Sequence, residues 1–178
     1  MTAHHDIPVL TTDRLILRGH RLDDFPDYAA LRADPEVARY IGGKTRSPAE
    51  SWSRLLHSAG HWSLQSFGFW MVEERGSGRF VGEVGFADFK RGIGADFDGT
   101  PEAGWVLASW SHGKGYATEA AEAALAWGER ELGMTRFVCM IDKAHAGSLR
   151  VAEKCGFRKF AETEFMGDPV ILLERVRT

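Results

Sequence analysis

Two glycines one residue apart, Gly113 and Gly115, stand directly before an alanine-rich segment in the stretch ASWSHGKGYATEA (108–120). Glycines let the backbone approach a phosphate closely, and the first amides of a helix attract anions. The spacing therefore indicates a phosphate-binding turn at the start of a helix. An isolated pair of this kind is about as often a tight turn that binds nothing, so the flanking sequence has to decide.

A dinucleotide-binding turn is the strongest alternative. Gly113-x-Gly115-x-x-Thr118 approximates G-x-G-x-x-G, and Asp142 ends the next predicted strand where a ribose-binding acid would stand. Two spacings argue against it, because residues 109–112 separate the preceding strand from Gly113 and only residues 143–178 follow Asp142. The pattern G-x-x-x-x-G-K-[ST] of nucleoside-triphosphate loops is absent as well. The sequence favours another phosphate-containing ligand.

Other side chains with chemical potential are better explained without a reaction. His57 and His61 have the i, i+4 spacing of metal ligands, but Ser58 replaces the glutamate of H-E-x-x-H and no third ligand follows nearby. Cys139 lies in a strongly apolar segment with no basic partner, which is typical of an inert core thiol. We therefore expect a stacked or solvated histidine pair, and no metal.

The composition predicts an ordinary globular protein. The 178 residues are 44% hydrophobic and 26% charged, which suits a single domain over 1–178. The net charge of −3 gives no general reason to bind nucleic acid or a membrane surface. Two cysteines, no apolar run of signal-peptide length and no membrane-spanning stretch lead us to expect a cytoplasmic protein.

The first third of the chain predicts one strand and two helices. TDRLILRGH (12–20) alternates apolar and charged residues as a half-buried strand does. Asp23 or Asp24 can cap a helix that Asp34-Pro35 ends. SPAE (47–50) is a capping box with proline at the first helical position. The spacing that follows predicts an inward helix face formed by Trp52, Leu55, Leu56 and Ala59.

The remainder predicts a mixed sheet. Residues 67–74 and 79–89 read as antiparallel strands joined by a hairpin at 76–78. A glycine-rich loop at 90–101 precedes a strand–helix–strand unit, which requires a parallel pair with a right-handed crossover. The elements of this second part are a strand at 102–108, a helix at 116–133, a strand at 136–142, a helix at 147–155 and closing strands near 157–165 and 169–176.

Four stretches together resemble the GNAT superfamily of acetyl-coenzyme-A-dependent N-acetyltransferases. They are TDRLILR, GRFVGEVGF (78–86), EAGWVLASWSHGKGYATEA (102–120) and GSLRVAEKCGF (147–157), in the family's order and spacing. Within the family they look most like the branch with the ribosomal-protein-alanine N-acetyltransferases. The resemblance implies an α/β (α+β) fold with helices on both faces of one mixed sheet. In that sheet the parallel strands 102–108 and 136–142 splay apart.

The resemblance also implies which residues bind acetyl-CoA. The turn and the first helical residues would hold the pyrophosphate through backbone amides, and pantetheine would pair with the exposed backbone of the splayed strand. Trp110 replaces the family's usual Gln or Arg three residues before the first glycine, which removes a side-chain contact and leaves the amides. The implied cofactor-binding residues are Trp105, Val106, Leu107, His112, Gly113, Lys114, Gly115, Tyr116, Ala117, Thr118, His145 and Ser148.

Acetylation of an amine by a thioester needs a neutral amine, an oxyanion donor and an acid for the thiolate. Glu102 is the first candidate for the base, acting through water, and Glu83 is the second; the amide of Val106 or Leu107 would serve the oxyanion. The tyrosine that many members use as acid is replaced by Ala152. Ser148 is left as a substitute. His145, at the position of a usual Asn, could bind a pantetheine carbonyl, shuttle a proton or merely cap a helix.

The acceptor is open at this stage. We expect a primary amine attacked directly in a ternary complex, with a protein N-terminal α-amine, ribosomal by resemblance, as the first hypothesis. A small amine such as an antibiotic, polyamine or amino acid is the second, and a CoA-binding sensor with little turnover is the third. Asp96 and Asp98 are expected to border the cleft and attract a cationic amine. The protein would act as a monomer or homodimer.

Overall fold

A computed structural model describes residues 7–177, in which eight strands form one sheet in the order β1-β2-β3-β4-β5-β6-β8-β7. Residues 1–6 and 178, which belong to the expected domain and to the N-terminal stretch searched for a signal, lie outside the described residues. Neighbouring strands are antiparallel except β5 and β6, which are parallel. The mixed sheet, antiparallel in its first half, is confirmed.

The elements of the first half fall close to their predicted positions. The strands are β1 (Leu10–Thr11), β2 (Leu15–Arg18), β3 (Phe69–Glu74) and β4 (Phe80–Ala87), and the helices are α1 (Phe25–Ala33), α2 (Pro35–Ala38) and α3 (Pro48–Gln65). Two short elements, β1 and α2, were not predicted. Each is too short to leave a periodic pattern in the sequence.

The second half agrees with the prediction to within two residues at each boundary. Its elements are β5 (Glu102–Leu107), α4 (Tyr116–Glu131), β6 (Arg136–Asp142), α5 (Ala146–Lys154), β7 (Arg158–Phe165) and β8 (Asp168–Val176). Gly133 and Gly156 have positive φ values of 64° and 79° just after α4 and α5. Both glycines therefore end their helices as expected.

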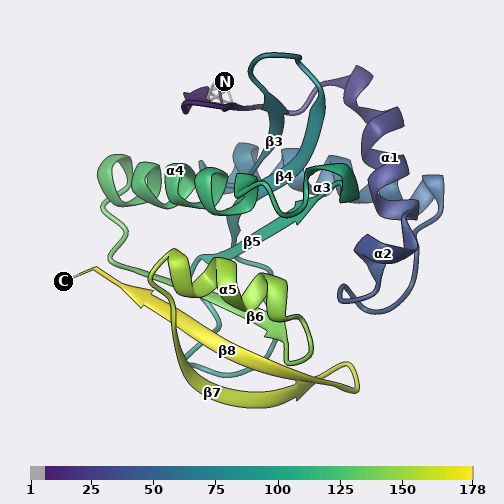
Figure 1. Cartoon of the computed structure of the whole chain (residues 1–178). Coiled ribbons are helices and arrows are strands. Elements are labelled where there is room, and N and C mark those ends of the chain that lie inside the picture. The colour runs from purple at the N-terminus through teal and green to yellow at the C-terminus, as the bar shows by residue number, and fades with distance from the viewer. Residues whose placement is uncertain (1–6, 178) are drawn as a thin grey trace.

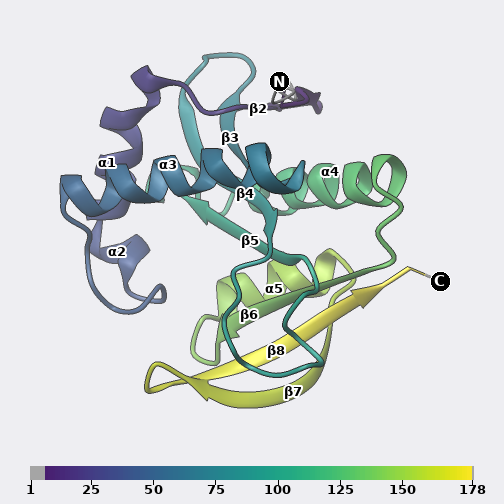
Figure 2. The same ribbon diagram turned by 180° about the vertical axis from the view of Figure 1, so that it is seen from behind.

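The helices cover both faces of the sheet. Figure 1 shows α4 and α5 in front of the strands, and Figure 2, seen from behind, shows α1 and α3 on the opposite face. Between the layers lies a core rich in aromatic side chains from α3, α4 and the central strands. Its members include Trp62, Trp70, Phe86, Trp127 and Phe137.

Helix α3 begins as predicted but faces the sheet differently. The Ser47 hydroxyl accepts the amide of Glu50, and the Glu50 carboxylate accepts the amide of Ser47, as a capping box requires. The predicted inward face is right for Leu55, which is buried, and wrong for Trp52 and Leu56, which are 36% and 50% exposed. The buried positions are Ser51, Leu55, Ser58, His61 and Trp62. Two of these positions are serines, and a hydrophobic pattern alone does not predict that polar residues lie on the buried face.

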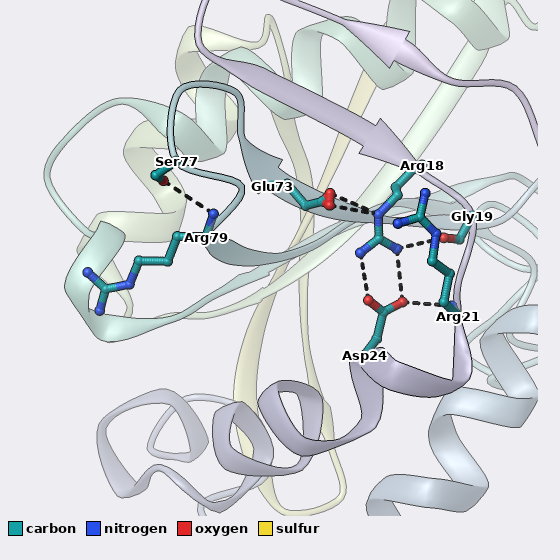
Figure 3. A network of polar contacts seen from close by, with 7 residues as sticks. All are labelled: Arg18, Gly19, Arg21, Asp24, Glu73, Ser77 and Arg79. Atoms are coloured by element: carbon teal, nitrogen blue, oxygen red, sulfur yellow. Dashed lines mark hydrogen bonds and ion pairs between the residues drawn. The ribbon is translucent and has the colours of Figure 1, made fainter.

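Asp24 has a different role from the predicted cap. Its carboxylate makes no capping bond in α1 and instead accepts two hydrogen bonds from the Arg18 guanidinium, at 2.6 and 2.9 Å. Arg18 also donates to Glu73 on β3, and the amide of Arg21 donates to Asp24 (Figure 3). This buried network ties the start of α1 to β2 and β3.

Candidate active site

The parallel strands β5 and β6 pair at one end only. Glu102 and Val138 are their single pair in register, next to a hydrogen bond from the Val138 amide to the Pro101 carbonyl (3.0 Å). Beyond this point the strands diverge, so the edge of β5 that faces β6 lacks a strand partner. The predicted splay is therefore present.

The register of β5 shows which amides face the gap. The amide of Ala108 donates to Val81 on β4 at 2.8 Å, and bond direction alternates along an antiparallel strand. The amide of Val106 therefore points to β4, whereas those of Trp105 and Leu107 point into the gap. Of the two amides expected to serve an oxyanion, only that of Leu107 is directed there.

Two cavities meet at this gap. The first has a volume of about 300 Å³ and is lined by residues of α1, α3, the loop after β4 and β8. The second has a volume of about 380 Å³ and lies along α4 and α5. They share the lining residues Tyr40, Ile41, Trp105, Val106, His145 and Ser148. A molecule in each cavity could thus meet at the splay, as a two-substrate transfer requires. We call the first the acceptor-side cavity and the second the α4–α5 cavity.

The glycine turn stands at the outer end of the α4–α5 cavity. Gly113 and Gly115 have φ values of 74° and 80°, a conformation that favours glycine, and α4 begins directly after them. A Cβ on Gly113 would meet open space, and one on Gly115 would meet only Arg14 Nη2, at 3.4 Å. Arg14 donates to the Lys114 carbonyl at 2.8 Å and pairs with Glu119, which fixes the turn on β2. The first amides of α4 remain available to an anion.

Comparisons with known proteins agree with this geometry. The sequence profile of the acetyltransferase (GNAT) domain matches residues 14–158. The chain belongs to the GNAT acetyltransferase family. A solved structure described as a GNAT-family acetyltransferase of Bordetella pertussis is 36% identical, with a TM-score of 0.85 over 95% of this chain and 99% of that one.

Further relatives of this GNAT protein bear on activity and fold. The N-acetyltransferase YoaA of Bacillus subtilis is 26% identical over 153 residues, which are 85% of this chain and 84% of YoaA. RimL, a ribosomal L7/L12 α-N-protein acetyltransferase solved with coenzyme A, shares the fold at 15% identity, with a TM-score of 0.76 over 96% and 98% of the two chains. The protein is an acetyl-CoA-dependent N-acetyltransferase.

The residues implied as cofactor ligands fall into two groups in the structure. Seven line the α4–α5 cavity: Trp105, Val106, Leu107, His112, Ala117, His145 and Ser148. The others, Gly113, Lys114, Gly115, Tyr116 and Thr118, make up the turn and the start of α4. Open space beside Gly113, the first amides of α4 and an unpaired strand edge all fit acetyl-CoA, with its phosphates and amide-rich pantetheine arm.

Two side chains of the turn point away from this role. The Tyr116 hydroxyl donates to Glu74 at 2.6 Å and its ring is buried, so only its amide is placed for a ligand. The Lys114 ammonium lies 4.6 Å from the centre of the Trp110 ring. Trp110, which stands where the family usually has Gln or Arg, thus holds the Lys114 ammonium beside the turn by a cation–π contact.

Glu102, the first candidate for the base, is buried and paired with Arg91. The Arg91 guanidinium donates to both carboxylate oxygens, at 2.5 and 2.7 Å. Burial raises the pKa of the Glu102 carboxyl, and the bonds from Arg91 act in the opposite direction. Glu83, the second candidate, is more deeply buried and accepts from Arg32 and from the Tyr28 hydroxyl. Both carboxylates line the acceptor-side cavity.

Ser148 and Trp105 are joined across the splay. The indole Nε1 of Trp105 donates to the Ser148 hydroxyl oxygen at 2.8 Å. Because the serine is the acceptor in that bond, its own hydrogen can be donated to another group. This arrangement leaves a hydroxyl donor on α5 four residues before Ala152, the position of the family's tyrosine.

His145 caps α5, as one of the expected alternatives has it. Its Nδ1 accepts the amide of Ser148 at 3.4 Å, and its ring stacks on Tyr40 with centres 4.2 Å apart. Burial lowers the pKa of His145, so the ring is neutral near pH 7. With Nδ1 used as acceptor, Nε2 carries the hydrogen and can donate one bond.

The expectation for Asp96 and Asp98 is wrong. Neither lines the acceptor-side cavity, and the Asp98 carboxylate accepts the amides of Gly92 and Gly94 within the loop. Nearby Phe97 packs on β6 and β8. The loop contributes Phe89 and Arg91 to the cavity instead, so its contribution there is aromatic and cationic rather than acidic.

Sequence reasoning missed Arg32, Arg54 and Tyr40, which also line the acceptor-side cavity. Arg54 lies three residues after Ser51, at the edge of the true inward face of α3, and would have been found had that face been assigned correctly. Tyr40 follows the unpredicted α2. The remaining candidates behave as expected: His57 and His61 stack edge to face at 4.4 Å, and Cys139 is buried with its pKa raised by burial.

No helix within residues 7–177 is long and apolar enough to cross a membrane.

Proposed function

We propose that this enzyme transfers acetyl from acetyl-CoA to an α-amine, with a protein N-terminus as the first candidate, by direct attack in a ternary complex. The observation that carries the proposal is the unpaired β5 edge at which the two cavities meet. It gives the acyl donor and the amine separate entrances to one reaction centre. The fold shared with an α-N-protein acetyltransferase supports the first candidate.

On this proposal the residues around the α4–α5 cavity bind acetyl-CoA, which supplies an acetyl group activated as a thioester. The amides of Gly113 to Thr118 hold the pyrophosphate, and the backbone of Trp105 and Leu107 pairs with the pantetheine arm. One of these two amides also donates to the thioester oxygen as negative charge develops there. His145 donates through Nε2 to a pantetheine carbonyl.

Proton transfer is assigned to two residues. Glu102 accepts the amine proton through water, helped by the burial that raises its pKa. An α-amine, with a pKa near 7.7 to 8.0, loses that proton far more easily than a lysine side chain. Ser148 donates to the departing sulfur, since its hydroxyl hydrogen is not used in the bond with Trp105. Glu83 is the second candidate for the base.

A free amino acid is the second candidate acceptor. The acceptor-side cavity of about 300 Å³ is at the small end of ligand sites. A short amine would fill it, whereas a peptide would leave most of its length outside.

The test is release of free thiol from acetyl-CoA across a panel of peptides, amino acids, polyamines and aminoglycosides. We expect α-amines to react faster than polyamines by about tenfold or more, in keeping with amine basicity. In Glu102→Gln the rate should fall about 100-fold and lose its acidic limb in a pH profile. Thiol release with none of these amines would overturn the proposal. An unchanged pH profile would remove Glu102 from the mechanism.

A further inference from the structure

Arg54 differs from the other arginines in the wall of the acceptor-side cavity. Arg32 and Arg91 are each paired with a buried carboxylate, Glu83 and Glu102. Arg54, on α3, makes no ion pair with any residue in the range 7–177. Its polar neighbours are uncharged: the ring of His57, whose Nδ1 lies 3.5 Å from Nη1, and the Tyr28 hydroxyl. Arg46, the fourth arginine of the wall, pairs with Glu50 on the exposed side of α3, so Arg54 alone among the four has no carboxylate partner within residues 7–177.

The surroundings hold this guanidinium in place without neutralising it. Phe89 lies beside both Arg54 and Arg91, whose guanidinium carbons are 4.9 and 4.8 Å from the centre of its ring. Burial and the nearby charge of Arg32 lower the pKa of Arg54, yet an arginine stays protonated at any physiological pH. A half-buried cation with no counter-ion gains when an anion joins it.

We propose that Arg54 binds a carboxylate of the acceptor, so that the substrate is an amine carrying a carboxylate close to its amino group. The inference rests on the proposed function and specifies its substrate. The planar fork of an arginine matches a carboxylate in a bidentate arrangement. The same cavity reaches Trp105, Val106 and Ser148 at the splay, so one small molecule can contact both places.

The charge distribution of the cavity supports an amino acid over a polyamine. Arg32, Arg54 and Arg91 gather on the side formed by α1, α3 and the loop after β4, where a polycation would be repelled. Asp142 and Asp168 line the side formed by β6 and β8, and neither forms an ion pair with a described residue. An amine that carries a carboxylate would therefore find a guanidinium on one side of the cavity and carboxylates on the other.

The carboxylate could come from a free amino acid or from an acidic side chain that follows a protein N-terminus. The first test compares kcat/KM for glutamate-type amino acids with kcat/KM for their α-amides, using the full chain. A parallel arm compares C-terminally amidated dipeptides with Glu or Gln in second place. We expect the substrate with the carboxylate to be preferred about 10- to 100-fold in one of the two comparisons. A preference among the amino acids would identify a free amino acid as the substrate, and a preference among the dipeptides would identify a protein N-terminus followed by an acidic residue.

Arg54→Gln should abolish this preference while changing the rate with the amide less than about threefold. Arg130→Gln, an exposed arginine on α4, is the matched control and should retain the preference. A preference that survives Arg54→Gln, or an amide that reacts as well as the acid in both arms, would overturn the inference. Should Arg54→Gln not fold, Arg54→Lys keeps the charge without the fork and should show an intermediate preference.

A binding measurement separates this inference from the proposed function. Calorimetry with CoA present compares the N-acetyl amino acid, which is the expected product, with its amide. Binding of the acid about tenfold tighter, lost in Arg54→Gln, supports the carboxylate site even where no amine is acetylated. Equal binding of the two, or no binding of either below about 10 mM, overturns it.

Discussion

Glu83 and Glu102 show how this fold keeps carboxylates inside an active-site cavity. Each accepts hydrogen bonds from an arginine of another element, Arg32 on α1 or Arg91 in the loop after β4. Removing one partner would leave a buried charge uncompensated, so each arginine matters to the state of its carboxylate. Arg54 is unusual for the same reason, because it forms no ion pair with a described carboxylate, whereas Arg32 pairs with Glu83.

His20 supplies a prediction about pH and stability. Burial lowers its pKa to about 4, and neither ring nitrogen has a hydrogen-bond partner among the described residues. In the unfolded chain its pKa is near 6.5. Between these values the unfolded state binds more protons, so the free energy of unfolding should fall as the pH drops from 6.5 to 4. The contribution of His20 to that fall is about 3 kcal/mol at most.

Urea unfolding of the wild type and of His20→Leu at several pH values between 4.5 and 7 checks this. The variant should lose about 2 kcal/mol less stability over that range, because its side chain does not titrate. Asp24 and Arg18, the charged neighbours of His20, are present in both proteins. Parallel curves for the two proteins would show that His20 does not titrate in the way its burial implies.

At the level of single residues, the sequence predicted the glycine turn and the splayed strand correctly, but it did not predict which groups pair with the charged side chains. Gly113 and Gly115 carry their backbone geometry in their residue type, since few other residues accept φ values of 74° and 80°. The pairing of Glu102 with Arg91 was not predicted, and the place of Asp98 was predicted wrongly, because the partner of a carboxylate depends on which arginine or amide the tertiary fold brings near it. Distances of this kind are not encoded in local spacing.

Helix α3 shows what local sequence decides about an element and what it does not. Its first turn follows from Ser47, Pro48 and Glu50 alone, because capping is a contact between residues three apart. Its orientation follows from packing, and the serines Ser51 and Ser58 take the inward positions that bulkier Trp52 and Leu56 were expected to hold. An amphipathic pattern predicts reliably that a helix has a buried face, but it predicts less reliably which residues form that face.

The capping box of α3 should contribute to the stability of the fold. Ser47→Ala removes the hydroxyl that accepts the Glu50 amide and should lower the free energy of unfolding by about 1 kcal/mol, or the melting temperature by about 2 to 4 °C. Ser53→Ala is the matched control, an exposed serine of the same helix whose hydroxyl donates to the Ala49 carbonyl. It should leave stability unchanged or slightly higher, as alanine favours the helix interior. Equal losses in both variants would contradict a specific role for the cap.

Across the whole molecule the sheet consists of two halves with a weak junction. Strands β1 to β5 form one antiparallel half, β6 to β8 form the other, and β5 meets β6 at a single residue pair. Figure 1 shows α4 lying over the first half and α5 over the second, and one hydrophobic core joins side chains of both halves, such as Phe86 and Phe137. A ligand that occupies the splay would add the hydrogen bonds that β5 and β6 do not make with each other.

Coenzyme A should therefore act on the junction, and hydrogen exchange of single amides can detect it. Without ligand the amides of Trp105 and Leu107 face the gap and should exchange quickly, while that of Val106 is directed at β4 and should be protected throughout. Saturating coenzyme A should slow exchange at Trp105, Leu107 and the turn residues, leaving Val106 as an internal control. At 100 times Kd it should also stabilise the fold by about 2.7 kcal/mol. Gly115→Glu, which places a carboxylate beside the phosphate site, should abolish both effects. If coenzyme A slowed hydrogen exchange equally at all β5 amides, it would not pair with the strand edge.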